Sequence, residues 1–134
     1  MFREDFVWGV ASSAYQVEGT DAADGRGACV WDMFAADGRV FEHQNADTSC
    51  DHMHHYKEDI ALMKHLGIRA YRFSLNWARI LPEGTGRVNE KAIAMYRDMI
   101  LTMKENGITP YLTLFHWEFP QALYERGGWQ NPDV

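Results

Sequence analysis

Short apolar segments alternate with amphipathic ones along this chain, and this alternation limits its possible folds more than any other feature. Residues 6–11, 70–75 and 109–115 have the length and apolar character of strands. Residues 54–66 and 90–105 place apolar side chains at helical spacing. Strand, helix, strand, helix, strand is the pattern of a parallel sheet with helical crossovers, so the sequence predicts an α/β fold.

The two predicted helices have recognisable ends and apolar faces. Asn89 is a suitable N-cap for the second helix, and Gly67 and Gly107 follow the expected C-termini. The predicted core-facing residues are Tyr56, Ile60 and Met63 on the first helix, and Ile93, Tyr96, Ile100 and Met103 on the second. Residues 12–49 are rich in Gly, Asp and Ala and are predicted as a long irregular stretch, which in a compact domain is usually functional or wrongly assigned.

Two parallel architectures fit this pattern, a (β/α)8 barrel and a doubly wound sheet. No Gly-x-Gly-x-x-Gly follows a predicted strand, which weakens the dinucleotide-binding version of the doubly wound sheet. The chain has 134 residues, whereas a closed barrel needs roughly 200 or more. The chain therefore cannot form a closed barrel by itself.

Composition excludes several classes of partner. Hydrophobic residues make up 46% and charged residues 24%, and the net charge is −6 with no basic block, so a nucleic-acid partner is not expected. No apolar run is long enough to span a membrane, and the first residues lack the apolar stretch of a signal peptide. We expect a cytoplasmic globular protein in which Cys29 and Cys50 are reduced thiols.

Polar and aromatic side chains follow each predicted strand, at the sheet edge where ligands of parallel α/β folds bind. Gln16 can serve adjacent hydroxyls as donor and acceptor, His116 can make one directed hydrogen bond, and Trp117 offers a stacking face. Such a set suits a polyhydroxylated ligand. The alternative is that Trp77 and Trp117 are packing residues and Arg72 is a structural ion-pair partner. The three clusters are residues 12–19, then Arg72, Ser74, Asn76, Trp77 and Arg79, then His116, Trp117 and Glu118.

A group of histidines raises the question of a metal site. Asp51, His52, His54 and His55 lie close together, and His52 and His55 could share a helix face. A helix entry with exposed or packed histidines is the favoured interpretation, so no metal is predicted.

Several blocks, in order along the chain, resemble glycoside hydrolase family 1, the β-glucosidases and their relatives. The block at residues 6–20 is similar to the amino-terminal signature of that family. The other matching blocks are residues 31–34, 51–60, 71–82, 113–123 and 127–129. They span essentially the whole chain.

The resemblance implies a (β/α)8 barrel that hydrolyses β-linked glycosides with retention of configuration and needs no metal or organic cofactor. In the family pattern, Gln16 and His116 match residues that hydrogen-bond hydroxyls of the sugar, and Trp117 matches an aromatic near the same ring. Arg72 matches an arginine beside the nucleophilic glutamate, where a cation lowers the carboxylate pKa. Glu18 belongs to the signature but is expected to be structural.

The sequence departs from the family pattern at four positions. Met53 stands where Tyr is usual, His55 where Arg is usual, and Asn76 where Ser is usual. Glu118 replaces a common Asp, which lengthens a side chain next to the expected sugar site.

Neither catalytic carboxylate of the family matches a residue of this chain. A retaining glycosidase uses two carboxyl groups about 5–5.5 Å apart. The resemblance places them in an Asn-Glu-Pro motif after the fourth strand and a Glu-Asn-Gly motif after the seventh, and the sequence contains neither. Asn89 and Glu90 open a helix and are followed by Lys91. We therefore expect no catalytic residue here, with Arg72 supporting a nucleophile that lies elsewhere.

Residues 1–134 are thus expected to be one segment, the amino-terminal portion of an incomplete catalytic barrel, with about three parallel strands and two to three helices. The end of the chain, with Asn131 and Pro132 placed like the start of another helix, suggests truncation. The expected activity is that of a retaining β-glucosidase, absent from the chain alone. Alternatives are a non-catalytic truncated remnant with weak sugar binding or an assembly role, and a 6-phospho-β-glucosidase. Expected partners are a β-glucoside and, through open sheet edges, further copies or a complementing carboxy-terminal chain.

Overall fold

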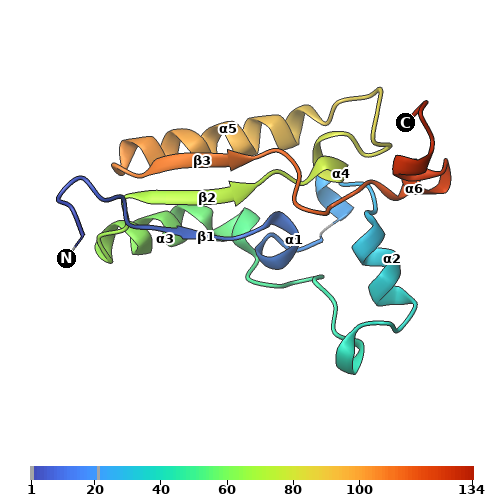
Figure 1. Cartoon of the computed structure of the whole chain (residues 1–134), viewed down its shortest axis with the longest axis horizontal. Coiled ribbons are helices and arrows are strands. Elements are labelled where there is room, and N and C mark those ends of the chain that lie inside the picture. Colours follow the sequence, from blue (N-terminus) through green and yellow to red (C-terminus); the bar gives the residue numbers. More distant parts are fainter. Residues whose placement is uncertain (1, 21) are drawn as a thin grey trace.

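Three short parallel strands form one sheet, and they lie side by side in the order in which they occur along the chain (Figure 1). They are β1 (Gly9–Ala11), β2 (Ala70–Ser74) and β3 (Thr109–Thr113). The computed structural model describes residues 2–20 and 22–134. The three predicted parallel strands are confirmed. β1 is shorter than predicted because Gly67, with a φ of +76°, turns the chain just before β2 and leaves residues 6–8 without a strand to pair with.

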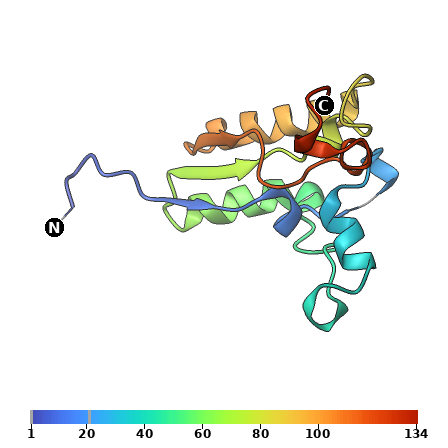
Figure 2. The same ribbon diagram turned by 45° about the vertical axis from the view of Figure 1, so that its right-hand side comes forward.

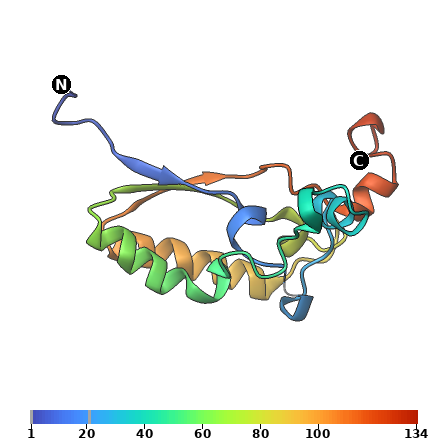
Figure 3. The ribbon, with the colours of Figure 1, turned by 90° about the horizontal axis from the view of Figure 1, so that it is seen from below.

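Two long helices, α3 (His52–His65) and α5 (Glu90–Glu105), cover the same face of the sheet (Figure 3). Both crossovers run in the same direction along the sheet, so both deliver their helix to one side. α5 has the predicted bounds, and the Asn89 side chain accepts a hydrogen bond from the Ala92 N–H at 3.4 Å. Neither these helices nor any other in the described part of the chain is long and apolar enough to cross a membrane.

The core lies between the sheet and the two long helices. Tyr96 and Met103 are buried as predicted, but Ile93 is 41% exposed. Ile93 and Ile100 line an apolar groove of about 270 Å³ beside β3. The buried face of α5 includes Ala92 and Met99 besides Tyr96 and Met103, because in the described chain α5 packs against α3, α4 and β3 and nothing covers its other side. The core residues are Met53, Ile60, Tyr71, Phe73, Tyr96, Met99, Met103 and Ile108.

Short helices gather at the end of the sheet toward which the strands point (Figure 1). They are α1 (Ala14–Val17), α2 (Val30–Ala36), α4 (Trp77–Ile80) and α6 (Gln121–Glu125), with 3-10 turns η1 (Ala22–Asp24), η2 (Phe41–His43) and η3 (Gly128–Gln130). The structure therefore adds four short helices to the two long ones, and two of them lie within residues 12–49, predicted as irregular. A helix of four to seven residues completes at most two turns, too few for a periodic signal. At the opposite end, the N-terminal residues extend away from the sheet (Figure 2).

The second face of the sheet carries no helix in the described part of the chain (Figure 3). Arg72 and Ser74 of β2 alternate with the core residues Tyr71 and Phe73, so they belong to this open face. In the sheet register Arg72 lies beside Tyr111 of β3. Helices on one face and polar or small side chains on the other match the arrangement expected for successive units of a barrel.

The two cysteines have contrasting environments. Both are free thiols, with Cys29 fully buried at the start of α2 and Cys50 exposed. Burial raises the pKa of Cys29 to about 11, and the nearby Asp32 carboxylate adds to the shift.

This contrast predicts selective labelling. At about pH 8, a thiol reagent should modify Cys50 at least about 100-fold faster than Cys29, because only Cys50 is accessible and burial disfavours the reactive thiolate of Cys29. Mass spectrometry of the time course measures both rates. In denaturant the two rates should converge; equal rates in the native protein would contradict the packing of α2.

Candidate functional site

The segments that follow the three strands lie next to one another. The Ser12 N–H donates to the Arg72 carbonyl at 3.0 Å, which joins the end of β1 to β2. The Leu75 N–H donates to the Thr113 carbonyl at 3.0 Å, which joins the end of β2 to β3. The clusters predicted after each strand therefore start from one edge of the sheet, where parallel α/β folds place their ligands.

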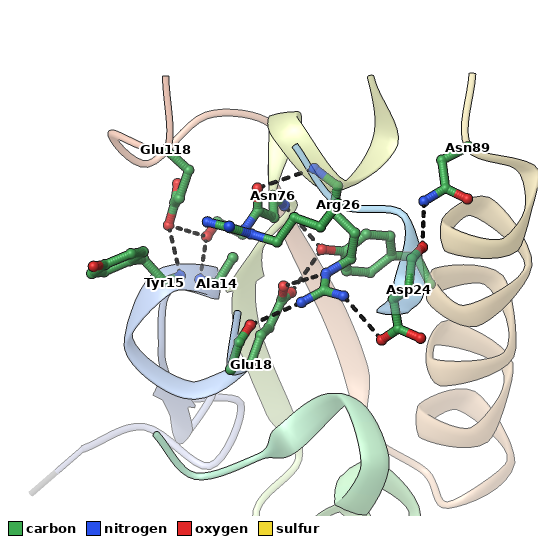
Figure 4. Close-up of polar contacts among 12 residues, drawn as sticks. Ala14, Tyr15, Glu18, Asp24, Arg26, Asn76, Asn89 and Glu118 are labelled. Atoms are coloured by element: carbon green, nitrogen blue, oxygen red, sulfur yellow. Dashed lines mark hydrogen bonds and ion pairs between the residues drawn. The ribbon is translucent and has the colours of Figure 1, made fainter. Parts of the chain in front are cut away.

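Gln16 lies on α1, immediately after β1, with an exposed side chain. α1 has only four residues and its N-cap, Ser13, makes no side-chain capping bond. Groups from other segments cap it instead: Ser74 Oγ accepts from the Ala14 N–H at 2.7 Å, and the Glu118 carboxylate accepts from the Tyr15 N–H at 3.0 Å (Figure 4). A helix this short is unstable alone, so these contacts hold the backbone that carries Gln16.

His116, Trp117 and Glu118 form a sharp turn after β3. Trp117 has a φ of +77°, a left-handed conformation that costs a bulky residue about 1–3 kcal/mol unless its surroundings enforce it. Glu118 is fully buried, and its Oε2 accepts from the His116 N–H at 3.2 Å, which spans the strained residue. The longer Glu118 side chain is thus directed into the protein (Figure 4). His116 is partly buried and Trp117 is 67% exposed.

An aromatic pocket of about 700 Å³ adjoins this turn. Its ring contacts include Phe115 with Trp117, at a centroid distance of 6.2 Å, and Phe119 with Trp129, at 4.9 Å. Flat apolar faces of this kind stack on sugar rings and on aryl groups. The aromatic lining residues are Trp31, Phe115, Trp117, Phe119, Tyr124 and Trp129.

Arg72 is exposed on the open face of the sheet. Within the described residues no carboxylate lies in ion-pair distance of its guanidinium. The alternative interpretation, in which Arg72 is a structural ion-pair partner, therefore has no support in this part of the chain. The guanidinium is available to an anionic group placed over the open face.

Three residues of the second cluster are turned into the protein. Trp77 packs edge-on against Phe119 and donates its Nε1–H to the Gly84 carbonyl at 2.9 Å, so its interpretation as a packing residue is confirmed. The buried Asn76 side chain caps α4 by accepting from the Arg79 N–H at 3.2 Å. The Arg79 guanidinium, expected near the ligand edge, is fully buried.

Arg79 is the centre of a buried polar network. Its Nε donates to Glu18 at 3.1 Å, its Nη1 to Asp24 at 3.3 Å and its Nη2 to the Gly19 carbonyl at 2.9 Å. Tyr96 of α5 donates to Glu18 at 2.7 Å. Burial raises the pKa of Glu18 to about 6, although the Arg79 guanidinium opposes the shift. Glu18 therefore has the structural role expected of it.

Histidines of the predicted group pair with carboxylate side chains of the protein itself. His52 is buried, and its Nδ1 lies 2.6 Å from Asp59. His54 Nδ1 lies 2.5 Å from Asp51. In residues 2–20 and 22–134 there is no group of three His, Cys, Asp or Glu side chains that could hold a metal ion.

The sequence did not reveal the residues that hold the site together. Ser74 and Glu118 were recognised as polar residues at strand ends, but not as the acceptors for α1. No local pattern could reveal this, because the bonded groups are 60 and 103 residues apart. The one available signal was a Glu within an otherwise aromatic segment, where an acidic residue is buried only if it is hydrogen-bonded.

Comparison with known proteins gives one consistent result. The family model for Glycosyl hydrolase family 1 matches residues 1–134. Beta-glucosidase A of Acetivibrio thermocellus is 47% identical in an alignment 134 positions long that covers 99% of this chain and 30% of that protein. Aryl-phospho-beta-D-glucosidase BglC of Bacillus subtilis is 44% identical in an alignment 135 positions long that covers 99% of this chain and 28% of that protein.

The structural comparison agrees. The family 1 β-glucosidase from Thermotoga maritima superposes with a TM-score of 0.93 and 50% identity over 97% of this chain and 30% of that one. The fold is therefore that of the amino-terminal portion of such a barrel. The chain spans about 30% of the length of the relatives it matches.

The Arg79 network predicts a large stability difference between two substitutions. Arg79→Met should lower the free energy of unfolding by about 3–5 kcal/mol, because it leaves the Glu18 carboxylate buried without its cation and removes one of the two cations that pair with Asp24. Lys91 also pairs with Asp24, at 2.7 Å, but its side chain is 62% exposed, so Lys91→Met should cost no more than about 1 kcal/mol. Thermal unfolding followed by tryptophan fluorescence at one protein concentration compares the two. Equal melting temperatures would contradict the central role of Arg79.

Proposed function

This chain belongs to glycosyl hydrolase family 1, and we propose that it supplies the amino-terminal third of the catalytic barrel of a retaining β-glucosidase. The observation that carries the proposal is the family match over residues 1–134. It is supported by exposed Gln16 and Trp117 beside His116 where the strands end. The substrate class is a terminal β-linked glucoside or a closely related sugar.

In this proposal Gln16 and His116 bind hydroxyls of the sugar, and Trp117 lies against its ring. The amide of Gln16 can serve two neighbouring hydroxyls, whereas His116 makes one directed hydrogen bond. Trp117 is held with its ring exposed at the border of the aromatic pocket, which suits a stacking contact. These contacts fix the orientation of the sugar relative to the reacting bond.

Arg72 is proposed to support the nucleophile. Its exposed guanidinium on the open face has no ion pair with the described residues, so a carboxylate contributed from outside them can approach. A cation at that position lowers the carboxylate pKa and keeps the nucleophile ionised.

The two catalytic carboxylates are proposed to come from outside these 134 residues. Glu18 and Glu118 lie near the site, but both are buried and accept hydrogen bonds from the protein itself. Neither can flank a glycosidic bond as an acid or as a nucleophile. The sequence contains neither the Asn-Glu-Pro nor the Glu-Asn-Gly motif expected for them.

A second candidate within the family is a 6-phospho-β-glucosidase. It is favoured by the 44% identity to a relative named as an aryl-phospho-beta-D-glucosidase. We propose that the choice between plain and phosphorylated sugars is made outside residues 1–134, since the chain matches both kinds of relative almost equally well. The cytoplasmic location predicted from the sequence stays a prediction.

A chimera tests the proposed function. Residues 1–134 would replace the matching 30% of the Thermotoga maritima β-glucosidase. We expect the chimera to hydrolyse an aryl β-glucoside, measured by release of the phenol, and the 134-residue chain alone to show no turnover.

Two substitutions in the chimera test the proposed sugar contacts. Gln16→Ala and His116→Ala should each lower kcat/KM by about 10- to 100-fold, because hydrogen bonds to the sugar strengthen in the transition state. Gln44→Ala, at an exposed position, is the matched control and should change little. A folded chimera without turnover would instead support the non-catalytic remnant.

The open edges of the sheet predict how the chain behaves alone. β1 and β3 are outer strands in the described sheet, and Leu112 of β3 is 44% exposed beside the apolar groove along α5. In a longer chain a further βα unit can cover this edge. Alone, the edge can pair only with other copies.

We therefore expect light scattering to give a mass above the 15.5 kDa of one chain. Leu112→Lys should reduce the association, because a charge on an edge strand opposes pairing. Val88→Lys, at an exposed position in the loop before α5, should not. A clean monomer at all concentrations would show that the edges do not drive assembly.

A further inference from the structure

We propose that Glu118 is a positioning residue that holds Gln16 and His116 at a fixed spacing, so that both can bind hydroxyls of one sugar ring. The inference rests on the proposed function of the site. Glu118 is fully buried and cannot touch the substrate itself. It acts through the backbone of the two residues' own segments.

The two oxygens of the Glu118 carboxylate serve two different segments. Oε1 accepts from the N–H of Tyr15, the residue before Gln16, at 3.0 Å, and Oε2 accepts from the N–H of His116 at 3.2 Å. One rigid, planar group therefore bonds both the segment after β1 and the segment after β3; Figure 4 shows its contact with Tyr15. The spacing of the two segments is set by the width of that carboxylate.

In the described chain, neither of these two N–H groups donates to another acceptor. The Tyr15 N–H belongs to the first turn of α1, where an amide has no partner within the helix. The His116 N–H lies beyond the last residue of β3 and makes no bond within the sheet. Ser74 completes the arrangement, since its Oγ accepts from the Ala14 N–H at 2.7 Å and its hydroxyl lies 3.5 Å from Glu118 Oε1.

The conformation of Trp117 provides independent support. The residue between His116 and Glu118 has a φ of +77°, which a tryptophan rarely adopts. The bond from the His116 N–H to the Glu118 carboxylate closes this turn. The buried carboxylate thus also maintains the turn that leaves Trp117 exposed. Strained backbone of this kind persists where surrounding contacts enforce it, commonly at binding sites.

Two substitutions separate the geometry of the carboxylate from its bulk. Glu118→Gln keeps the size, but an amide has a single acceptor oxygen and presents its NH2 to the second N–H. Glu118→Asp keeps both acceptor oxygens on a shorter side chain. Glu105→Gln makes the same chemical change at an exposed position at the end of α5 and is the matched control.

The experiment uses the chimera described above and compares an aryl β-glucoside with its monodeoxy analogues. Gln16→Ala and His116→Ala identify which hydroxyls the two residues bind. On the parent glucoside, Glu118→Gln should lower kcat/KM by about 10- to 100-fold, the loss expected from a displacement of about 1 Å. On analogues lacking an identified hydroxyl, the same substitution should cost no more than about threefold, because the misplaced contact is already absent. Glu118→Asp should stay within about fivefold of the parent, and Glu105→Gln should equal it.

An equal loss on every analogue would overturn the proposal, because a merely structural role lowers the active fraction without regard to the substrate. Unchanged kinetics in Glu118→Gln would overturn it as well. If Glu118→Gln does not fold, Glu118→Asp carries the test, and its smaller loss must still be concentrated on the identified hydroxyls. An inactive parent chimera would count against the proposed function, whereas an active chimera with uniform losses would count only against the role of Glu118.

Discussion

The buried guanidinium of Arg79 joins parts of the chain that no secondary structure connects. Its three nitrogens bond Glu18 and Gly19 after α1, and Asp24 of η1, while Tyr96 links the same network to α5. Buried charges are tolerated only when they are paired and hydrogen-bonded. The segment after β1 therefore reaches the interior in an arrangement that satisfies Arg79, and this arrangement, together with the Ser74 and Glu118 contacts to α1, places Gln16.

The two faces of the sheet differ in what covers them. One face is closed by α3 and α5 over a continuous apolar core, whereas the other carries Arg72 and no helix in the described residues. The closed face supplies stability, and the open face and the strand ends carry the groups able to bind a ligand. Under the proposed function, this separation allows the segment to contribute sugar contacts while the carboxylates for hydrolysis come from outside it.

Prediction from the sequence succeeded where the signal is local. The apolar period of residues 90–105 and the cap at Asn89 define α5, and three apolar runs define the strands. It was less successful where the signal depends on distant partners. Ile93 fits the apolar stripe but is exposed, because β3 has no further strand beside it in the described sheet. Arg79 follows β2 like a ligand-binding residue, yet it lies inside, because two acidic residues far away in the sequence neutralise it.

The sequence by itself determined the α/β class with three parallel strands, the family and the candidate residues Gln16, Arg72, His116 and Trp117. These follow from periodicity and from motifs, which are properties of neighbouring residues. Only the tertiary structure decided that Glu118 faces inward, that its two oxygens join α1 to the His116 turn, and that Trp77 packs while Trp117 remains exposed. The physical reason is that a hydrogen bond between residues 103 positions apart depends on folding to bring its donor and acceptor together, and no local pattern records it.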